Sequence, residues 1–463
     1  MKKSLTSLPH LTFILFAVVL IASCQSNKQD VVVGTKPNII IIFADDMGYG
    51  DLSCYGHPII KTPHIDQMAH EGIRLTSFYA AAPVCTPSRA ALLTGRYPIR
   101  NLPNNIGPES KHGLPLTEVT IADVLKEQNY KTMAIGKWHL GYGKPELMPT
   151  GRGFDHFYGL PYSNDMILPW CPWLAPEHNK LELYQDNTPI REIGFNQDSL
   201  TIDYTTEAVE FIKSSKYDPF FLYFAHSMPH LPISTAESFR GKSKAGLYGD
   251  VVQTIDWSVG QIMKTLKEQN LDDNTLVIFT SDNGPWQNLP NRMLQRGVEL
   301  WHGGSAGILR GSKATTYEGG FRVPGIVRWP GQIPENQVSD ELATTMDLFS
   351  TLIEISGGTV PKGRDIDGQN ILPFLKENGV SPRDQFIYLK GKKVEAVRDK
   401  NWKFRNTEDG GIELFELNMD PSEKYNRAEA YPELVEKYYK QMQDFAVKTN
   451  ANIDRLYHTE DLK

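Results

Sequence analysis

The stretch Asn38-Ile39-Ile40-Ile41-Ile42-Phe43-Ala44 decides the fold, and it runs directly into Asp45-Asp46-Met47-Gly48-Tyr49-Gly50-Asp51. A continuous β-branched apolar run of this length is typical of a strand covered on both faces, as in a parallel sheet. The adjacent carboxylates that end it repel one another unless a cation lies between them. We therefore expect a buried strand over 38–44, followed by either a metal site or a solvated acidic turn.

Three further apolar runs end in polar groups in the same way. They are residues 131–141 with Lys137 and His139, 219–225 with His226 and His230 beyond it, and 275–280 with Asp282 and Asn283 beyond it. Amphipathic patterns over 62–69, 120–127, 201–213, 248–267 and 344–356 predict helices between and after these strands. Ligands of such α/β sheets bind beyond the carboxyl ends of the strands. We expect an α/β fold whose large, mostly parallel sheet is sandwiched by helices and collects these groups at one edge.

Weaker patterns complete the larger domain. Residues 73–79 predict a short strand, and residues 309–324 a loop followed by a strand. The glycine- and aromatic-rich stretch 151–165 reads as a loop, and 181–196 has no strong pattern.

The character of the chain changes after about Pro373. Short β-type runs at hairpin spacing, over 386–389, 394–397, 402–405 and 412–417, precede a helical pattern over 433–447. This predicts a smaller C-terminal α+β subdomain with an antiparallel sheet over 373–463, beside a larger domain over 37–372.

The first residues have the pattern of an export signal. Two lysines precede an apolar run over 11–22, which is too short to span a bilayer. The run ends Ile21-Ala22-Ser23-Cys24, which resembles the lipobox of bacterial lipoproteins. We expect a signal peptide over 1–23, lipidation of Cys24 and a polar tether over 24–36, with a plain signal peptide as the alternative. The mature chain would then be an exported, periplasmic or outer-membrane-anchored lipoprotein of a Gram-negative bacterium.

Composition restricts the partners of the chain. The formal net charge is −7 over 463 residues, so no basic footprint indicates nucleic-acid binding. Cys54 and Cys171 could pair in an oxidising compartment, but two cysteines define no disulfide framework, and we expect both to be free and buried.

A second informative stretch is Pro83-Val84-Cys85-Thr86-Pro87-Ser88-Arg89-Ala90-Ala91-Leu92-Leu93-Thr94-Gly95. Thr86 is suited to cap a helix and Pro87 to its first position, which would place Cys85 just before a helix N-terminus. Arg89 would add a positive charge one turn further on. Taken alone, this pattern fits either a reactive thiol or a helix start with an incidental cysteine.

The polar groups at the expected sheet edge define a chemical class. The oxygen donors of Asp45, Asp46, Asp282 and Asn283 suit calcium or magnesium. Arg89, Lys137 and Lys313 would form an anion pocket beside such a cation, and histidines there can exchange protons with a reacting oxygen. The residues therefore predict metal-assisted hydrolysis of an anionic ester of either phosphorus or sulfur.

The stretch from Cys85 to Gly95 resembles the first signature of the formylglycine-dependent (type I) sulfatases, arylsulfatase-like members of the alkaline phosphatase superfamily. The second signature resembles residues 130–139, and the chain departs from it at Asn129, a turn position where the family often has glycine. Residues around Asp45, His230, Asp282 and Lys313 also correspond, so the resemblance extends from about residue 36 to the C-terminus.

The resemblance implies a set of roles. A maturation enzyme would convert Cys85 to formylglycine, whose hydrate is the nucleophile. One calcium ion would be held by the formylglycine oxygen at Cys85 and by Asp45, Asp46, Asp282 and Asn283. Arg89 would hold the nucleophile, and Lys137 and Lys313 would bind the sulfate. His230 would protonate the leaving oxygen, and His139 would take a proton so that sulfate is expelled.

Two further residues are candidates for substrate binding. Ser163 lies where some arylsulfatase-like members contact the sulfate, and His302 fits either a sugar pocket or a solvated loop. By the same resemblance His226 is structural. The implied substrates are sulfate esters of carbohydrates, such as glycosaminoglycan, mucin or algal polysaccharide fragments. A phosphonate monoester or phosphodiester hydrolase and a glycan-binding lipoprotein with an inactive site are the alternatives.

Overall fold

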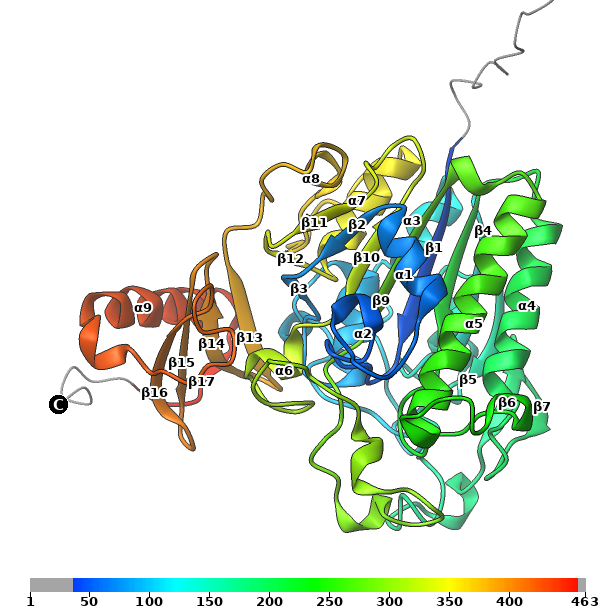
Figure 1. The fold of residues 1–463 in the computed structure, drawn as a ribbon, viewed down its shortest axis with the longest axis horizontal. Coiled ribbons are helices and arrows are strands. Elements are labelled where there is room, and N and C mark those ends of the chain that lie inside the picture. The colour runs from blue at the N-terminus through cyan, green and yellow to red at the C-terminus, as the bar shows by residue number, and fades with distance from the viewer. Residues whose placement is uncertain (1–35, 457–463) are drawn as a thin grey trace, which may run out of the picture. The chain divides into compact units, whose positions relative to one another are not determined.

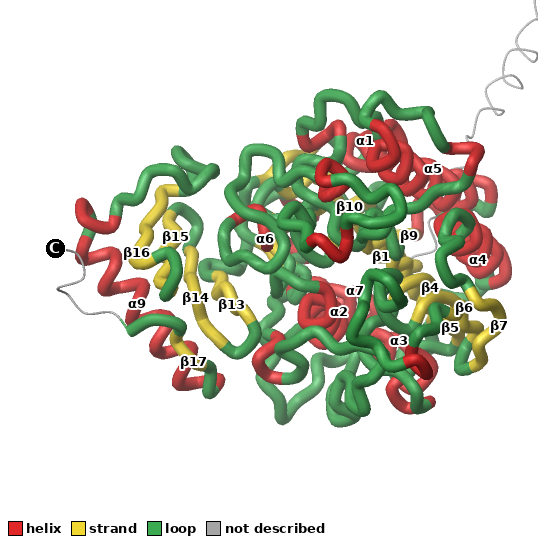
Figure 2. Tube along the Cα trace, turned by 90° about the horizontal axis from the view of Figure 1, so that it is seen from below, coloured by secondary structure: helices red, strands yellow, loops and turns green. Residues whose placement is uncertain are grey.

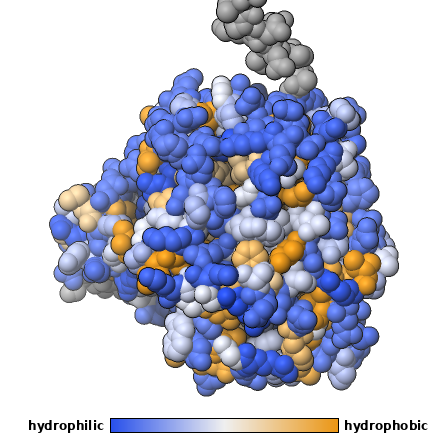
Figure 3. Space-filling model, turned by 45° about the vertical axis from the view of Figure 1, so that its right-hand side comes forward, coloured by the Kyte–Doolittle hydropathy of each residue, from blue (hydrophilic) through white to orange (hydrophobic). Residues whose placement is uncertain are grey.

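The computed structural model describes residues 36–456. The predicted signal peptide, all but the last residue of the predicted tether, and the lipidation site Cys24 lie outside the described residues. No helix within residues 36–456 has both the length and the apolar character needed to cross a membrane. The face shown in Figure 3 is mostly hydrophilic, with its apolar residues in small separate groups.

The centre of the fold is a ten-stranded mixed sheet (Figure 1). Strand β1 (Asn38–Ala44) pairs in parallel with both β8 (Phe220–Ala225) and β9 (Thr275–Ser281). Beyond β8, β4 (Lys131–Lys137) continues the parallel arrangement. All residues of β1 are buried, which confirms the predicted central strand and the predicted parallel core of the sheet.

Helices cover both faces of this sheet, as the continuous burial of its central strands requires. Ile40 and Ile42 belong to a core that includes side chains of α1 (Pro63–His70), α4 (Leu200–Ser214) and α5 (Gly246–Glu268). Ile39 and Ile41 pack instead into a core on the opposite face. That core includes residues of α2 (Cys85–Thr94), α3 (Ile121–Glu127) and α7 (Asp347–Ser356). Figure 2 shows these two groups of helices on either side of the strands.

The edges of the sheet were predicted less well. The stretch expected as a loop contains β5 (His156–Leu160), and the unassigned stretch forms the hairpin β6 (Glu182–Gln185) and β7 (Thr188–Glu192). Strand β5 pairs in parallel with β4, and a Cβ at Gly159 would lie 1.9 Å from the Gly136 carbonyl oxygen. The glycine that suggested a loop therefore permits close strand pairing.

On the other side, the expected strand over 73–79 is divided. It forms β2 (Ile73–Leu75) in the large sheet and β3 (Phe78–Tyr79), which pairs with β12 (Ala343–Thr344). Residues 309–324 contain the short helix α6 (Glu318–Phe321) instead of the expected strand. The strand β10 (Gly325–Arg328) begins just after this stretch. Strand β10 is antiparallel to β9 and β2, and β11 (Gln337–Ser339) completes this edge.

The C-terminal region has the predicted antiparallel sheet. Its strands are β13 (Phe386–Lys390), β14 (Lys393–Arg398), β15 (Trp402–Thr407) and β16 (Gly411–Glu416). Helix α9 (Pro432–Thr449) packs on it, and β17 (Asn452–Ile453) is parallel to β14. The short helix α8 (Leu372–Glu377) lies at the predicted domain boundary. Tyr79 and Phe321 share a core with Phe386 and Tyr388, so this sheet is packed against the larger part of the fold.

Candidate active site

The carboxyl ends of the parallel strands bring the predicted side chains together. Asp45 and Asp46 follow β1, and Asp282 follows β9, whose last residue, Ser281, is in register with Ala44. Lys137 ends β4, and His230 lies beyond β8. The prediction that these groups share one edge of the sheet is confirmed.

Helix α2 supplies Cys85 and Arg89, with one difference from the expectation. Cys85 is the first residue of the helix, two residues before the predicted first position at Pro87. The predicted capping role of Thr86 is wrong, because its hydroxyl donates to the His139 carbonyl at 3.0 Å. Thr86 instead joins the cysteine helix to the end of the lysine–histidine strand.

Three buried cations and three buried carboxylates alternate around Cys85. Arg89 Nη2 lies 2.8 Å from Asp282 Oδ2 and 3.3 Å from Asp45 Oδ1. Lys137 Nζ lies 2.7 Å from Asp45 Oδ2, and Lys313 Nζ lies 2.8 Å from Asp46 Oδ2. Formal charges within this set cancel, which is what makes its burial tolerable.

Cys85 lies within this cluster. Its Sγ is 3.5 Å from Asp45 Oδ1, 4.0 Å from Asp46 Oδ1 and 3.5 Å from Lys313 Nζ. Burial, reinforced by the charge of Asp282, raises the pKa of the thiol well above its ordinary value. The thiolate is the reactive form of cysteine, so the unmodified side chain is held in its unreactive form. The interpretation of Cys85 as a reactive thiol is therefore not supported.

The pKa values of the three carboxylates are shifted in different directions. Burial raises the pKa of Asp45 to about 7 against the opposing effect of Lys137, and it also raises the pKa of Asp46. Burial acts on Asp282 in the same direction and is the largest single effect, but the charges of Arg89, Lys137 and Lys313 together outweigh it and hold the pKa of this carboxyl below its usual value.

The donor set fits a hard divalent cation. Ligand atoms of Asp45, Asp46, Cys85 and His230 all lie within 4.8 Å of one another. The side-chain nitrogen of Asn283 donates to Asp46 at 2.7 Å, whereas its Oδ1 is buried without a hydrogen-bond partner. An unpaired amide oxygen beside carboxylates is the environment that calcium and magnesium prefer. Asp282 is already engaged, since its Oδ1 accepts from the Asp46 N–H at 3.0 Å.

The two histidines have defined tautomers. His230 Nδ1 donates to the Leu231 carbonyl at 2.6 Å, which leaves Nε2 facing Asp46 Oδ2 at 3.6 Å. His139 Nε2 donates to the Ile106 carbonyl at 2.7 Å, and its Nδ1 is buried without a partner. Burial lowers the pKa of both rings, with Lys313 adding to the effect at His230 and Lys137 at His139. Each ring thus keeps one nitrogen free for proton exchange.

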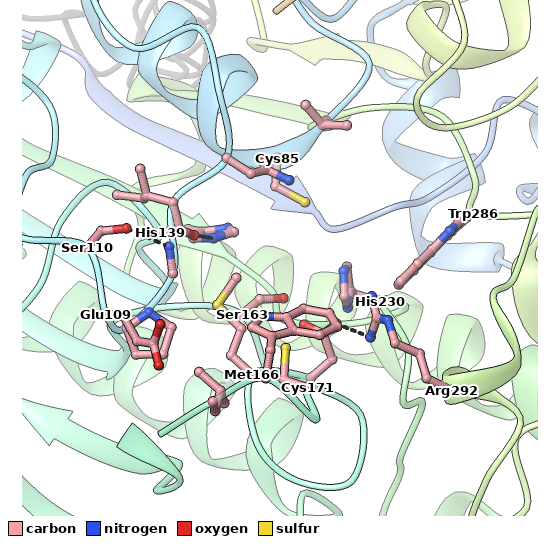
Figure 4. A pocket seen from close by; sticks show the side chains of 18 of the residues that line it. Cys85, Glu109, Ser110, His139, Ser163, Met166, Cys171, His230, Trp286 and Arg292 are labelled. Carbon is pink, nitrogen blue, oxygen red and sulfur yellow. Dashed lines mark hydrogen bonds and ion pairs between the residues drawn. The ribbon is translucent and has the colours of Figure 1, made fainter. Parts of the chain in front are cut away.

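The cluster opens into a cavity of about 560 Å³ (Figure 4). Cys85 lies at one end, and Ser163, Met166 and Cys171 lie across from it, with His139 on one side. Trp286 and Arg292 line the opposite side, and Arg292 projects into the opening. Ser163 lines the cavity with a buried, unpartnered hydroxyl, as a sulfate-contacting residue would.

His302 does not line this cavity. It is buried in its own loop, where Nδ1 accepts from the Glu299 N–H at 3.1 Å, so the structure does not bring it together with the other predicted site residues. Within residues 36–456 all three cysteines are free, but Cys54 is partly exposed rather than buried. Sequence reasoning missed the contribution of residues 105–110 to the cavity, because loop residues carry no periodic signal.

Comparisons with known proteins agree with this geometry. A family model described as "Sulfatase" matches residues 37–358, and one described as "N-sulphoglucosamine sulphohydrolase, C-terminal" matches residues 311–448. Arylsulfatase A of Bos taurus is 37% identical, covering 86% of this chain and 85% of that protein. N-acetylgalactosamine-6-sulfatase of Homo sapiens is 40% identical, covering 76% of this chain and 68% of that protein.

Solved structures give the same picture. Ps i-CgsB in complex with k-i-k-neocarrahexaose is 31% identical, with a TM-score of 0.77, covering 89% of this chain and 93% of that one. The phosphonate monoester hydrolase of Agrobacterium radiobacter is 20% identical, with a TM-score of 0.63 and coverage of 89% and 96%. That second likeness extends to the fold alone.

Proposed function

The chain belongs to the sulfatase family of sulfuric ester hydrolases, in the alkaline phosphatase-like superfamily, and from this premise we propose that it releases inorganic sulfate from sulfated carbohydrates. The proposed catalytic groups are a formylglycine derived from Cys85 and one calcium ion. The observation that carries the proposal is the position of Cys85, buried among three carboxylates and three cations. A thiol is a poor ligand for a hard cation, whereas an oxygen at the same position would complete the donor set.

The proposed ligands of calcium are Asp45, Asp46, Asp282, Asn283 and the oxygen at position 85. Calcium would supply Lewis-acid stabilisation of negative charge at the reacting oxygens. Formylglycine would supply a hydrated aldehyde, with one hydroxyl to attack sulfur and a second to expel the sulfate.

The remaining chemistry falls to side chains that the cluster already positions. Lys313 lies 3.5 Å from Cys85 Sγ and lines the cavity, so its ammonium would bind a sulfate oxygen. Lys137 Nζ contacts the Asp45 carboxylate. Arg89 contacts and orients both Asp45 and Asp282, and it adds positive charge to the site. These fixed charges would stabilise charge that develops on the sulfuryl group, without rearrangement during the reaction.

His230 and His139 would handle the protons. Nε2 of His230 faces the cluster. Because Nδ1 already donates to the Leu231 carbonyl, Nε2 would first take up a proton, making the ring an imidazolium, and would then pass that proton to the leaving sugar oxygen. Nδ1 of His139 is free and would accept the proton whose removal lets sulfate leave.

The carbohydrate part of the proposal rests on the outer cavity. Trp173 and Trp286 lie there, and Trp173 is 61% exposed, so an aromatic face is available for a sugar ring. A relative named N-acetylgalactosamine-6-sulfatase and a structural neighbour crystallised with k-i-k-neocarrahexaose support the same substrate class. A phosphonate or phosphodiester substrate is the alternative. The phosphonate monoester hydrolase among the structural neighbours is only 20% identical in sequence to this chain.

The proposal includes export of the chain. We propose removal of residues 1–23, lipidation at Cys24, and modification of the Cys85 segment by a maturation enzyme before export. Mass analysis of the two cysteine-containing peptides from protein made in a maturing host tests both modifications.

Sulfate release tests the function directly. The protein, produced with a maturation enzyme and calcium, is offered a panel of defined sulfated mono- and disaccharides, and free sulfate is measured. Cys85→Ala should abolish release, whereas Cys54→Ala, at a free cysteine outside the site, should retain it. Full release by Cys85→Ala would refute the mechanism. Faster turnover of a phosphonate monoester than of any sulfate ester would favour the alternative.

A further inference from the structure

Residues 310–319, here called the Lys313 segment, connect the active site to the C-terminal sheet. At one end Lys313 Nζ contacts Asp46 and Cys85. The segment continues into α6, which lies between the large sheet and β13 in both ribbon views (Figures 1 and 2). Helix α6 begins five residues after Lys313, so a displacement of α6 by the C-terminal sheet would occur close to Lys313.

A fully buried charge network holds α6. The Glu318 carboxylate accepts hydrogen bonds from the Tyr79 and Tyr388 hydroxyls and lies 3.0 Å from Lys403 Nζ. Lys403, on β15, also lies 2.8 Å from Glu423, whose other oxygen accepts from the Glu318 N–H at 2.7 Å. None of Glu318, Lys403 and Glu423 is exposed to solvent. The C-terminal region thus binds Glu318 through both its side chain and its backbone.

Two further residues of the segment are bound to the same sheet. The Thr316 hydroxyl donates to Glu395 at 2.7 Å and accepts from Arg405 Nε at 3.1 Å. The Tyr317 hydroxyl donates to Glu413 at 3.0 Å. Three consecutive residues of the segment are therefore fixed by strands β14, β15 and β16.

The backbone beside Lys313 has little freedom to absorb a displacement. Ala314 has a φ of 69°, which is unfavourable for a residue with a Cβ, and its N–H donates to the Pro83 carbonyl at 2.9 Å. The Lys313 N–H donates to the Pro285 carbonyl at 2.9 Å. Such a conformation persists only where the surrounding structure determines it.

We infer that Lys403 is a positioning residue for Lys313: by neutralising Glu318 and Glu423 it holds the Lys313 segment where its ammonium can bind sulfate. The inference rests on the proposed function, in which Lys313 contacts the sulfuryl oxygens. The C-terminal region is then part of the sulfate-binding apparatus, although Lys403 itself touches neither substrate nor metal ligand.

Lys403→Met tests the inference, because methionine keeps much of the volume but removes the charge. Of its neighbouring cations, Glu318 would keep only Arg322 and Arg398, each at 3.7 Å, and it would face Glu423 without the ammonium between them, so the Lys313 segment should shift. We expect KM for the sulfate ester and the inhibition constant of inorganic sulfate to rise together by about tenfold or more, since the charge-assisted hydrogen bond from Lys313 to a sulfate oxygen would be weakened. Lys403→Met/Glu423→Gln, which removes one of the two carboxylate charges, should recover part of the affinity.

A matched control separates positioning from general destabilisation. Arg383→Met breaks another buried ion pair of the C-terminal region, the one between Arg383 and Asp347 of α7. Neither of these two residues forms a hydrogen bond or ion pair with the Lys313 segment, which lies wholly within the described part of the chain. Arg383→Met should lower the melting temperature about as much as Lys403→Met does, without changing the inhibition constant of sulfate. Equal effects of Arg383→Met and Lys403→Met on that constant would overturn the inference.

A crystal structure of Lys403→Met provides a readout that does not depend on turnover. Displacement of Lys313 Nζ from its 2.8 Å contact with Asp46 is expected, and an unmoved Lys313 would overturn the inference. Failure of the wild-type protein to release sulfate from any ester would instead refute the proposed function.

Discussion

Replacing His226 by leucine should make the protein more resistant to acid while leaving sulfate release intact. His226 follows the same strand as His230, but it does not line the cavity. Its ring is fully buried 4.3 Å from the ring of Phe224, and both ring nitrogens lack a hydrogen-bond partner. A positive charge there would have no compensation, so burial lowers the pKa of His226 from 6.5 to about 3.

The sign and size of the effect follow from this pKa. Between pH 6.5 and pH 3 the unfolded chain binds a proton at His226 that the folded protein does not bind. The folded state therefore loses stability as the pH falls through this window. Each pH unit below 6.5 contributes about 1.4 kcal/mol, so about 2 kcal/mol is lost by pH 5.

Urea unfolding followed by tryptophan fluorescence at pH 7 and pH 5 measures the effect. The change in unfolding free energy between the two pH values should be about 2 kcal/mol smaller for His226→Leu than for the wild type. Groups common to both proteins cancel in this comparison. Leu222→Val, a buried change without a titratable group on the strand that precedes His226, is the control and should leave the pH dependence unchanged.

Two results would refute the reasoning. An unchanged pH dependence in His226→Leu would mean that the buried ring is not held neutral by lack of a partner. Loss of sulfate release in a folded His226→Leu protein would mean that the roles of the two histidines had been exchanged.

Two other predictions concern the metal and the proton donor. Calcium should raise the melting temperature, with about 2.7 kcal/mol of stabilisation at a concentration one hundred times the dissociation constant. Calorimetry should show no such rise for Asp45→Ala, and an undiminished rise would exclude Asp45 as a ligand. His230→Gln should slow release of sulfate from an alkyl sugar ester by about 10²- to 10⁴-fold, and from an aryl ester with an acidic leaving group much less. Equal losses on the two esters, measured as kcat, would remove His230 from the role of proton donor.

The central strands and the juxtaposition of the proposed metal ligands were predictable because one physical constraint links them. A run such as 38–44 can only be buried on both faces, and its parallel neighbours must end at the same edge. Asp45, Asp46, Asp282 and Asn283 follow from that constraint. The N-terminus of the cysteine helix lies two residues earlier than predicted, at Cys85 rather than Pro87, and Thr86 bonds instead to His139, a contact distant in sequence.

Other parts of the structure depend on contacts that no local pattern records. Strand β5 was hidden by Gly159, whose role is to admit the neighbouring backbone. Lys403 is 90 residues from Lys313 in sequence, and its importance appears only when the C-terminal sheet is seen against α6. The cavity wall formed by 105–110 depends on loop conformation in the same way.

The equal numbers of buried cations and carboxylates have a thermodynamic consequence. Arg89, Lys137 and Lys313 balance Asp45, Asp46 and Asp282 before anything binds, so a divalent cation alone leaves an uncompensated positive charge in a water-poor site. A sulfate oxyanion alone leaves a negative one. Each ion should therefore bind more tightly when the other is present, and by linkage the two increases in affinity are equal. Calcium and sulfate would behave as mutual effectors of a site that is electrically neutral when empty.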